Sequence, residues 1–400
     1  MKLSGRIARL KPSATLSINA KANALKRSGV GIINFGIGEP GFDTPENIGN
    51  AAMQSIRSGQ TRYTAVGGID ELKDAVCTTI KADYGLSYGR ENVLVSCGGK
   101  HALYNLFMTL LDPGDEVIVP SPYWVSYPDM IELANAKPVI VPCTEKDAFM
   151  LQAEDLERAI TPNTRLLILN SPSNPTGKYY GPDKLKALAK VLLRHENVLI
   201  ASDDIYYRIL FGGRKWVSLG MVEEKLRGRI FIINGVSKSY SMTGWRIGYL
   251  IGDPMVIKAA TDFQSQVTSN PSSVSQWASV EALTGDQKSA VEMAQTFEKR
   301  CKLVMERISG LPEVTCTEPD GTFYVFPDFS GHFGKKFAGR TINGSLDLAD
   351  FLMEEAHVAM VPGNAFGQDN CIRFSYALSM EQIEQGFDAV KKALKKLARG

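Results

Sequence analysis

Short runs of Val, Ile and Leu recur through the middle of this 400-residue chain, and stretches with helical spacing separate several of them. Continuous apolar strands that alternate with helices are typical of a mostly parallel sheet covered by helices on both faces. In such a sheet, ligands bind beyond the carboxyl ends of the strands. We therefore predict an α/β fold with its site at that edge, built on strands within residues 93–96, 116–119, 139–141, 166–169, 198–201 and 230–233.

The pattern changes at about residue 286. A long helical stretch leads to Ser309, and short strand-like runs and two further helices come after it, the last of them from Met380. This mixture predicts a smaller α+β domain, with a cleft between it and the large one. A helix is expected near the N-terminus, within residues 13–28. The predicted division is an N-terminal segment that packs with the small domain, a large domain and a small domain: residues 1–45, 46–285 and 286–400.

The composition excludes several classes of partner. The chain has 45 basic and 43 acidic residues and a formal net charge of +2, with no tail of one sign, so we expect neither nucleic acid nor a membrane surface. The apolar runs are too short to cross a bilayer, and the N-terminus lacks the apolar core of a secretory signal. Six scattered cysteines without C-x-x-C and only four histidines favour reduced thiols, a cytoplasmic protein and no metal site.

Lys238 lies in the most unusual string of the sequence, residues 234–248, directly after the apolar strand at 229–233. Burial at a strand end favours the neutral amine, and a neutral lysine can form a Schiff base with an aldehyde. Ser237 and Arg246 lie close enough in sequence to hold a phosphate. An aldehyde with a phosphate describes pyridoxal phosphate. Taken alone, a lysine after a strand would usually keep its ammonium group in water.

Polar residues and glycines lie after other predicted strands, as expected of a ligand pocket. Each has an ordinary structural explanation when taken alone. A glycine turn before a helix is a weak anion signal, Asn-Pro-Thr-Gly is a turn, an Asp can cap a helix, a Trp packs in a core, and an Arg forms a surface ion pair. The candidates are Gly99 and Lys100, Trp124, Asn174, Asp203, Tyr206 and Arg373, with Gly38 and Tyr63 in two further glycine loops.

The Lys238 string resembles the lysine-attachment signature of class I aminotransferases, the fold-type I enzymes that depend on pyridoxal phosphate. The resemblance covers essentially the whole chain and is closest to the bacterial Iβ subgroup of aspartate aminotransferases, some of which also transaminate prephenate. It is carried by the runs Gly38-Glu39-Pro40, Phe42-Asp43-Thr44-Pro45, Gly98-Gly99-Lys100, Ser121-Pro122-Tyr123-Trp124-Val125-Ser126-Tyr127-Pro128, Asn174-Pro175-Thr176-Gly177 and Met242-Thr243-Gly244-Trp245-Arg246.

The resemblance implies a role for each candidate in binding the cofactor. Lys238 would form the Schiff base and then carry a proton, and Asp203 would pair with the pyridine nitrogen. Asp204 stands where the family usually has Glu, which leaves Asp203 as the better candidate. Asn174 and Tyr206 would form hydrogen bonds with the 3′ oxygen of the cofactor, and Trp124 would stack on its ring. The cofactor phosphate would be held by Gly99, the Lys100 backbone, Ser237, Arg246, and Tyr63 from the other subunit of a homodimer.

The resemblance also implies the substrates, which are amino acids and 2-oxo acids. Arg373 would hold the α-carboxylate through its planar fork, and the Gly38 backbone, Trp124 and Asn174 would contact the same molecule. The Lys100 side chain would bind a second carboxylate, and Lys11 matches a position linked to prephenate use. The expected reaction moves the amino group of L-aspartate to 2-oxoglutarate, giving oxaloacetate and L-glutamate by a ping-pong route.

Other functions stay open from the sequence. The same fold could act on prephenate, aromatic amino acids or alanine, or the protein could be a lyase or synthase with the same cofactor. A more distant alternative is a dinucleotide-binding dehydrogenase or a non-catalytic binding protein. No G-x-G-x-x-G opens the first helix of the sheet, however, and the Lys238 string would then have no explanation.

Overall fold

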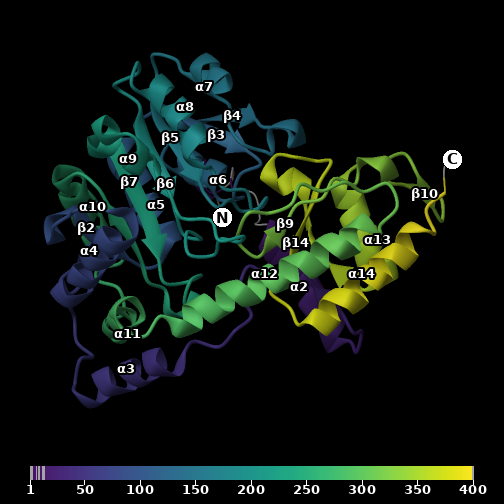
Figure 1. Ribbon diagram of the computed structural model, residues 1–400, viewed down its shortest axis with the longest axis horizontal. Helices are drawn as coiled ribbons and strands as arrows, with labels where there is room; N and C mark the ends of the chain where they lie inside the picture. Colours follow the sequence, from purple (N-terminus) through teal and green to yellow (C-terminus); the bar gives the residue numbers. More distant parts are fainter. Residues whose placement is uncertain (1–2, 6, 8–9, 11–13, 399–400) are drawn as a thin grey trace.

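A computed structural model describes residues 3–5, 7, 10 and 14–398 of the chain (Figure 1). Its largest feature is a seven-stranded sheet in which β8 runs in the opposite direction to the other six strands. The mostly parallel α/β sheet predicted from the apolar runs is therefore confirmed. Its strands, in spatial order, are β2 (Val93–Ser96), β8 (Gly248–Ile251), β7 (Ile230–Gly235), β6 (Leu199–Asp203), β5 (Thr164–Asn170), β3 (Glu116–Ser121) and β4 (Lys137–Pro142).

Two hydrophobic cores lie on the two faces of this sheet, because successive side chains of a strand point in opposite directions. In β7, Ile230 and Ile232 join one core, whereas Phe231 and Ile233 join the other. Helices α4 (Asp70–Tyr84), α8 (Pro182–Leu192) and α11 (Ser273–Thr284) cover the first face. The second face is covered by α5 (Gly99–Leu110), α6 (Tyr127–Leu133) and α10 (Pro254–Val267).

Three further helices complete this part of the molecule. Helix α3 (Glu46–Arg57) packs against α11, and α7 (Ala153–Ala159) and α9 (Leu219–Val222) both pack against α8. Beyond them, the 22-residue helix α12 (Lys288–Ser309) runs from the neighbourhood of α11 into the C-terminal part of the chain (Figure 1). One long helix therefore connects the part that contains the large sheet to the C-terminal part.

The C-terminal part has a separate aromatic core. Phe374 stacks on Phe387, with ring centroids 5.3 Å apart, and Phe35 from the N-terminal segment packs edge-on against both rings. The elements around this core are α13 (Ser345–Ala356), α14 (Met380–Leu394) and the antiparallel sheet β13-β14-β9 (Val361–Pro362, Ile372–Ser375, Tyr324–Val325). A small ribbon, β10-β11 (Lys336–Phe337, Arg340–Thr341), lies at its margin.

The N-terminal segment packs against the C-terminal part. Strand β1 (Ile33–Asn34) pairs in parallel with β12 (Val358–Ala359), and α2 (Ala14–Arg27) contacts β12 and β13. Lys21 of α2 forms an ion pair of 3.0 Å with Asp350 of α13. Among the described residues, no helix has both the length and the apolar character needed to cross a membrane.

Candidate active site

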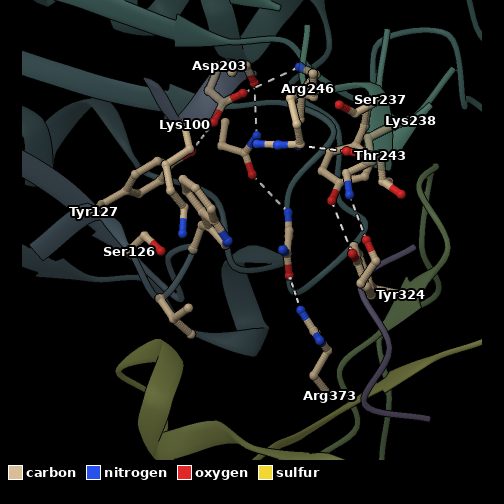
Figure 2. Close-up of a pocket in the computed structure, with 18 residues that line it drawn as sticks. Lys100, Ser126, Tyr127, Asp203, Ser237, Lys238, Thr243, Arg246, Tyr324 and Arg373 are labelled. Carbon is tan, nitrogen blue, oxygen red and sulfur yellow. Dashed lines mark hydrogen bonds between the residues drawn. The ribbon is translucent and has the colours of Figure 1, made fainter. Parts of the chain in front are cut away.

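A cavity of about 300 Å³ opens where β5, β6 and β7 end (Figure 2). Every predicted site residue that the structure describes lines it, with the exception of Tyr63. Its lining comes from the strand ends of the large sheet, from the loop after β1 and from the C-terminal part: Gly38, Gly99, Lys100, Trp124, Val125, Ser126, Tyr127, Asn170, Asn174, Asp203, Ile205, Tyr206, Ser237, Lys238, Thr243, Arg246, Tyr324 and Arg373.

Lys238 lies three residues beyond the end of β7 and extends into this cavity. Its Nζ donates a 2.6 Å hydrogen bond to the Gly38 carbonyl. Burial lowers the pKa of Lys238 to about 8, the Glu39 carboxylate opposes this shift, and the guanidinium groups of Arg373 and Arg246 add to it. A substantial fraction of the amine is therefore neutral near physiological pH, which is the nucleophilic form.

Asp203 is the last residue of β6, and its side chain is almost fully buried. The Tyr127 hydroxyl donates to Asp203 Oδ2 at 2.6 Å. Burial raises the pKa of Asp203 to about 6, while the Tyr127 hydrogen bond and the positive charge of Lys238 work in the other direction. A cationic group bound beside this carboxylate would hold it in the ionised form.

The neighbouring Asp204 does not line the cavity. Its carboxylate accepts hydrogen bonds from Ser202 Oγ at 2.7 Å and from Tyr84 OH at 3.0 Å. Burial raises the pKa of Asp204 well above its usual value. Of the two adjacent carboxylates, Asp203 is thus the one that a ligand in the cavity can reach.

Several hydrogen-bond donors gather in one corner of the cavity, where α5 begins. Gly98 has φ +93°, and a Cβ atom on it would lie 2.5 Å from Arg246 Nη2, so only glycine fits without displacing this arginine. Arg246 itself is fixed by donating to the Thr243 carbonyl at 2.8 Å. A helix N-terminus, a guanidinium group and the Ser237 hydroxyl in one corner suit a phosphate.

Arg373, on β14, enters the cavity from the opposite side (Figure 2). Its side chain is only 2% exposed, and it donates to Asn174 Oδ1 and to the Gly36 carbonyl, both at 3.0 Å. Its guanidinium carbon lies 4.4 Å from the centre of the Tyr324 ring. Within the described part of the chain, Nε has no hydrogen-bond partner, and no carboxylate pairs with this buried charge. An anionic ligand would supply both.

A second cation lies at the rim formed by α5 and the loop before α6. Lys100 Nζ is 4.9 Å from the centre of the Trp124 ring, and the Trp124 ring meets Tyr127 edge-on at 5.4 Å. Burial lowers the pKa of Lys100, and Arg246 adds to this effect. The cavity thus offers cationic groups at separate places, as a ligand with more than one anionic group requires.

Two tyrosines of the cavity lining contact each other. The hydroxyl of Tyr206 lies 3.1 Å from that of Tyr324, and both side chains are buried. The Asn174 backbone N–H donates to Asn170 Oδ1 at 2.8 Å, which fixes the turn that presents Asn174. These hydroxyl and amide groups could form hydrogen bonds with a polar ligand in the cavity.

Several cavity residues were not predicted from the sequence. Tyr127 lies in the same run as Trp124, three positions later, so the run itself contained a signal for it. Tyr324 lies on a predicted strand, but nothing in its surroundings indicates which face it occupies. The other cavity residues without a prediction are Val125, Ser126, Asn170, Ile205 and Thr243.

One predicted residue that the structure describes, Tyr63, does not line the cavity. Tyr63 is 91% exposed in the loop before α4, away from the cavity. Its predicted role concerns a second copy of the chain and stays a prediction. Lys11 lies outside the described residues. Across the described ranges, no three His, Cys, Asp or Glu side chains gather closely enough to hold a metal ion, and the six cysteines are free thiols.

The chain is similar to proteins of known family along its whole length. A family model described as aminotransferase class I and II matches residues 30–390. A probable aspartate/prephenate aminotransferase of Rickettsia bellii is 48% identical over 392 residues, which are 98% of each chain. The aspartate aminotransferase of Geobacillus stearothermophilus is 46% identical over 393 residues, again 98% of each chain.

Solved structures show the same similarity. The aspartate aminotransferase of Rhizobium meliloti superposes with a TM-score of 0.96 at 43% identity and covers all of both chains. The aspartate aminotransferase of Thermus thermophilus, solved with maleate, gives a TM-score of 0.92 at 40% identity over 98% of this chain and all of the other.

Proposed function

The chain belongs to the class I and II aminotransferases, and from this we propose that it is a pyridoxal-phosphate enzyme that moves the amino group of L-aspartate to 2-oxoglutarate. The products would be oxaloacetate and L-glutamate. The observation that carries the proposal is the meeting of Lys238, Asp203, Arg246 and Arg373 in one cavity. Membership of this family leaves the dehydrogenase alternative without support.

The residues of the cavity fit pyridoxal phosphate. The corner at Gly98, which a Cβ atom would fill, and the guanidinium of Arg246 suit its phosphate. The buried Asp203 carboxylate, whose pKa is raised to about 6, suits a protonated ring nitrogen. Asn174 and Tyr206 would bond the 3′ oxygen, and Trp124 would stack on the ring. When bound, the cofactor supplies an aldehyde and an electron-withdrawing ring.

Lys238 would act as the base of the reaction. Because its pKa is lowered to about 8, its amine can both take up and release a proton near neutral pH. Nζ would remove the proton from Cα of the bound amino acid. Asp203, held by Tyr127, would keep its negative charge next to the ring nitrogen, where it favours the withdrawal of electrons.

Two cations would select the substrate. Arg373 would bind the α-carboxylate that every amino acid carries, and the Gly38 backbone would lie beside it. Lys100 would bind the second carboxylate of aspartate or 2-oxoglutarate. The Thermus thermophilus relative was solved with maleate, which is also a dicarboxylate.

Prephenate is a second candidate substrate. The Rickettsia relatives are named aspartate/prephenate aminotransferases, and prephenate carries two carboxylates that the same two cations could hold. Lys11 would contribute to its binding. An assay of arogenate formation from prephenate with aspartate as donor tests this second activity.

We further propose a cytoplasmic homodimer in which Tyr63 of one subunit reaches the phosphate bound by the other. The high exposure of Tyr63 in the single chain supports this arrangement.

The separate cores support a division into residues 1–45, 46–285 and 286–400, with the N-terminal segment packed on the small domain.

The deciding experiment combines a spectrum with a panel of amino donors. The purified protein with pyridoxal phosphate should absorb visible light and use aspartate faster than alanine or phenylalanine, with 2-oxoglutarate as acceptor. Lys238→Ala should lose the visible band and at least about 10³-fold in turnover, as expected when a covalent catalyst is removed. A Lys238→Ala variant with wild-type turnover would refute the assignment.

A further inference from the structure

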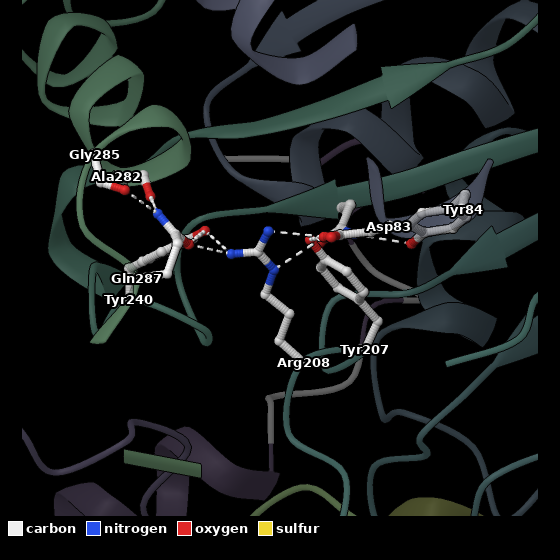
Figure 3. A network of polar contacts seen from close by, with 9 residues as sticks. Asp83, Tyr84, Tyr207, Arg208, Tyr240, Ala282, Gly285 and Gln287 are labelled. Carbon is white, nitrogen blue, oxygen red and sulfur yellow. Dashed lines mark hydrogen bonds and ion pairs between the residues drawn. The ribbon is translucent and has the colours of Figure 1, made fainter. Parts of the chain in front are cut away.

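Arg208 joins segments that are far apart in the sequence (Figure 3). It reaches Asp83 at the end of α4, Tyr240 after β7, and Gln287 at the start of α12. We call these residues and Tyr207 the Arg208 network. None of its members lines the cavity.

Every polar group of the network that faces Arg208 has a partner. Asp83 Oδ2 accepts from Arg208 Nε at 3.1 Å, from Arg208 Nη2 at 2.7 Å and from the Tyr207 hydroxyl at 2.7 Å. Arg208 Nη1 donates to the Tyr240 hydroxyl and to Gln287 Oε1. The guanidinium carbon lies 5.4 Å from the Tyr207 ring centre and 5.5 Å from that of Tyr240. Such a fully paired network holds its members in one arrangement.

Gln287 extends the network to the long helix α12. The Tyr240 hydroxyl donates to Gln287 Oε1 at 2.7 Å. Gln287 Nε2 in turn donates to the carbonyls of Ala282 at 3.0 Å and Gly285 at 2.8 Å (Figure 3). The turn between α11 and α12 is therefore tied to the segment after β7.

The position of the network in the sequence connects it to the site. Arg208 lies two residues after Tyr206 and five after Asp203, and Tyr240 lies two residues after Lys238. The backbone pairing of β6 with β7 ends at Asp203 and Ile233. Beyond that point, the regular ladder no longer sets the distance between the two segments, whereas Arg208 bonds Tyr240 directly.

We propose that Arg208 is a positioning residue, which holds the segment with Asp203 and Tyr206 at a fixed distance from the segment with Lys238. This role rests on the proposed function, because those residues serve the reaction. Arg208 can do this because its planar guanidinium group has donors that point in different directions. Nε and Nη2 donate to Asp83, and Nη1 donates to Tyr240 and Gln287. A lysine has one ammonium group and cannot span these partners.

The test compares Arg208 with an arginine that has only structural partners. Arg229 stands at the opposite end of β7 and donates to the carbonyls of Leu192, His195 and Val198 at 2.7–3.0 Å. Arg208→Met, Arg208→Lys and the milder Tyr240→Phe are therefore compared with Arg229→Met. If Arg208→Met does not fold, Arg208→Met combined with Asp83→Asn removes the unpaired carboxylate as well.

The first measurement is hydrogen exchange of the purified full-length protein. We expect amides in residues 204–210 and 236–246 to exchange about tenfold faster in Arg208→Met, with Arg208→Lys between it and wild type. In Arg229→Met these segments should exchange as in wild type, even where its melting temperature falls. Wild-type exchange of both segments in Arg208→Met and Tyr240→Phe would overturn the proposal.

The second measurement is turnover with aspartate. Arg208→Met should lose about tenfold to a hundredfold in kcat with little change in KM, because misplaced catalytic groups affect the reaction more than ground-state binding. A kcat equal to that of Arg229→Met would contradict the role. If wild-type protein turned over no amino donor, the proposed function would fail, and the exchange experiment would still test the link between the two segments.

Discussion

At the scale of single residues, the site is organised by charges whose burial is only partly compensated. Lys238, Asp203 and Arg373 are all held in one cavity, and burial shifts the pKa of each in the direction that favours its neutral form. Strongly shifted pKa values are typical of functional sites, where a bound ligand supplies the charged or hydrogen-bonding partners that the buried groups otherwise lack. Two predictions concern these groups individually.

The first concerns pH. Only the neutral amine of Lys238 attacks an aldehyde, and this form increases as pH rises towards the lowered pKa of about 8. The rate at which pyridoxal phosphate combines with cofactor-free protein should therefore rise about tenfold per pH unit at low pH. The rate should level off above about pH 8. Stopped-flow absorbance measures this. A rate that still rises nearly tenfold between about pH 8 and about pH 9 would show an ordinary lysine.

The second concerns Tyr127, which the sequence did not single out. Its hydrogen bond lowers the pKa of Asp203, so Tyr127→Phe should raise that pKa further. The pH below which cofactor-free protein loses affinity for pyridoxal phosphate should move up by about one pH unit, while stability falls by only about 1 kcal/mol. Tyr180→Phe is the control, because that buried hydroxyl bonds the Leu151 N–H. An identical pH dependence of this affinity in both variants would contradict the role of Tyr127.

At the scale of elements, the site depends on how closely strand ends and helix starts approach each other. Asp203 ends β6, Lys238 lies just beyond β7, and Gly98 stands immediately before α5. A Cβ atom on Gly248, at the start of β8, would lie 2.2 Å from the Gly99 nitrogen. Glycine is therefore required at Gly98 and Gly248 because a side chain would collide with neighbouring atoms, and at Gly98 also because φ is positive.

Gly98→Ala tests this contact. Both the positive φ and the approach of 2.5 Å to Arg246 Nη2 oppose a methyl group there, so affinity for pyridoxal phosphate should fall at least about tenfold. Gly114→Ala is a matched control, because Gly114 has φ +103° but no atom within 4 Å of the added carbon. Both variants should lose about 1–2 kcal/mol of stability, measured by denaturant unfolding. Equal affinities for the cofactor in the two variants would contradict the proposed phosphate corner.

At the scale of the whole molecule, the cavity joins two separately packed parts. Arg373 comes from the sheet of the C-terminal part, and it bonds Asn174 from the loop after β5 and Gly36 from the segment after β1. Lys100, by contrast, comes from α5 on the large sheet. A dicarboxylate substrate would thus be held from both sides of the cleft.

Two substitutions separate these cations. Arg373→Lys should raise KM at least about tenfold for every amino donor, because all of them carry an α-carboxylate. Lys100→Gln should raise KM for aspartate by a similar factor and leave alanine nearly unchanged, because alanine has no second carboxylate. Steady-state assays with both donors decide this. Equal losses for aspartate and alanine in Lys100→Gln would remove its proposed role.

Local patterns were enough to predict the framework. The six apolar runs became strands, and five of them are mostly buried, because burial on both faces of a sheet requires continuous Val, Ile and Leu. The sixth, β4, is the edge strand and is only partly buried. The carboxyl ends of parallel strands share one edge, so Asp203, Asn174 and Lys238 were expected to meet, and they line one cavity. Membership of the aminotransferase family, expected from the Lys238 string, is confirmed.

Only the folded chain decided which side chains face one another across those elements. The contacts of Tyr127 with Asp203, of Tyr206 with Tyr324 and of Arg208 with Asp83 join residues more than 70 positions apart. No periodicity within either segment encodes such a pair, because it depends on the packing of separate elements. The sequence by itself thus determined the strands and the chemistry at their ends, and tertiary packing determined the distances and pKa values on which that chemistry depends.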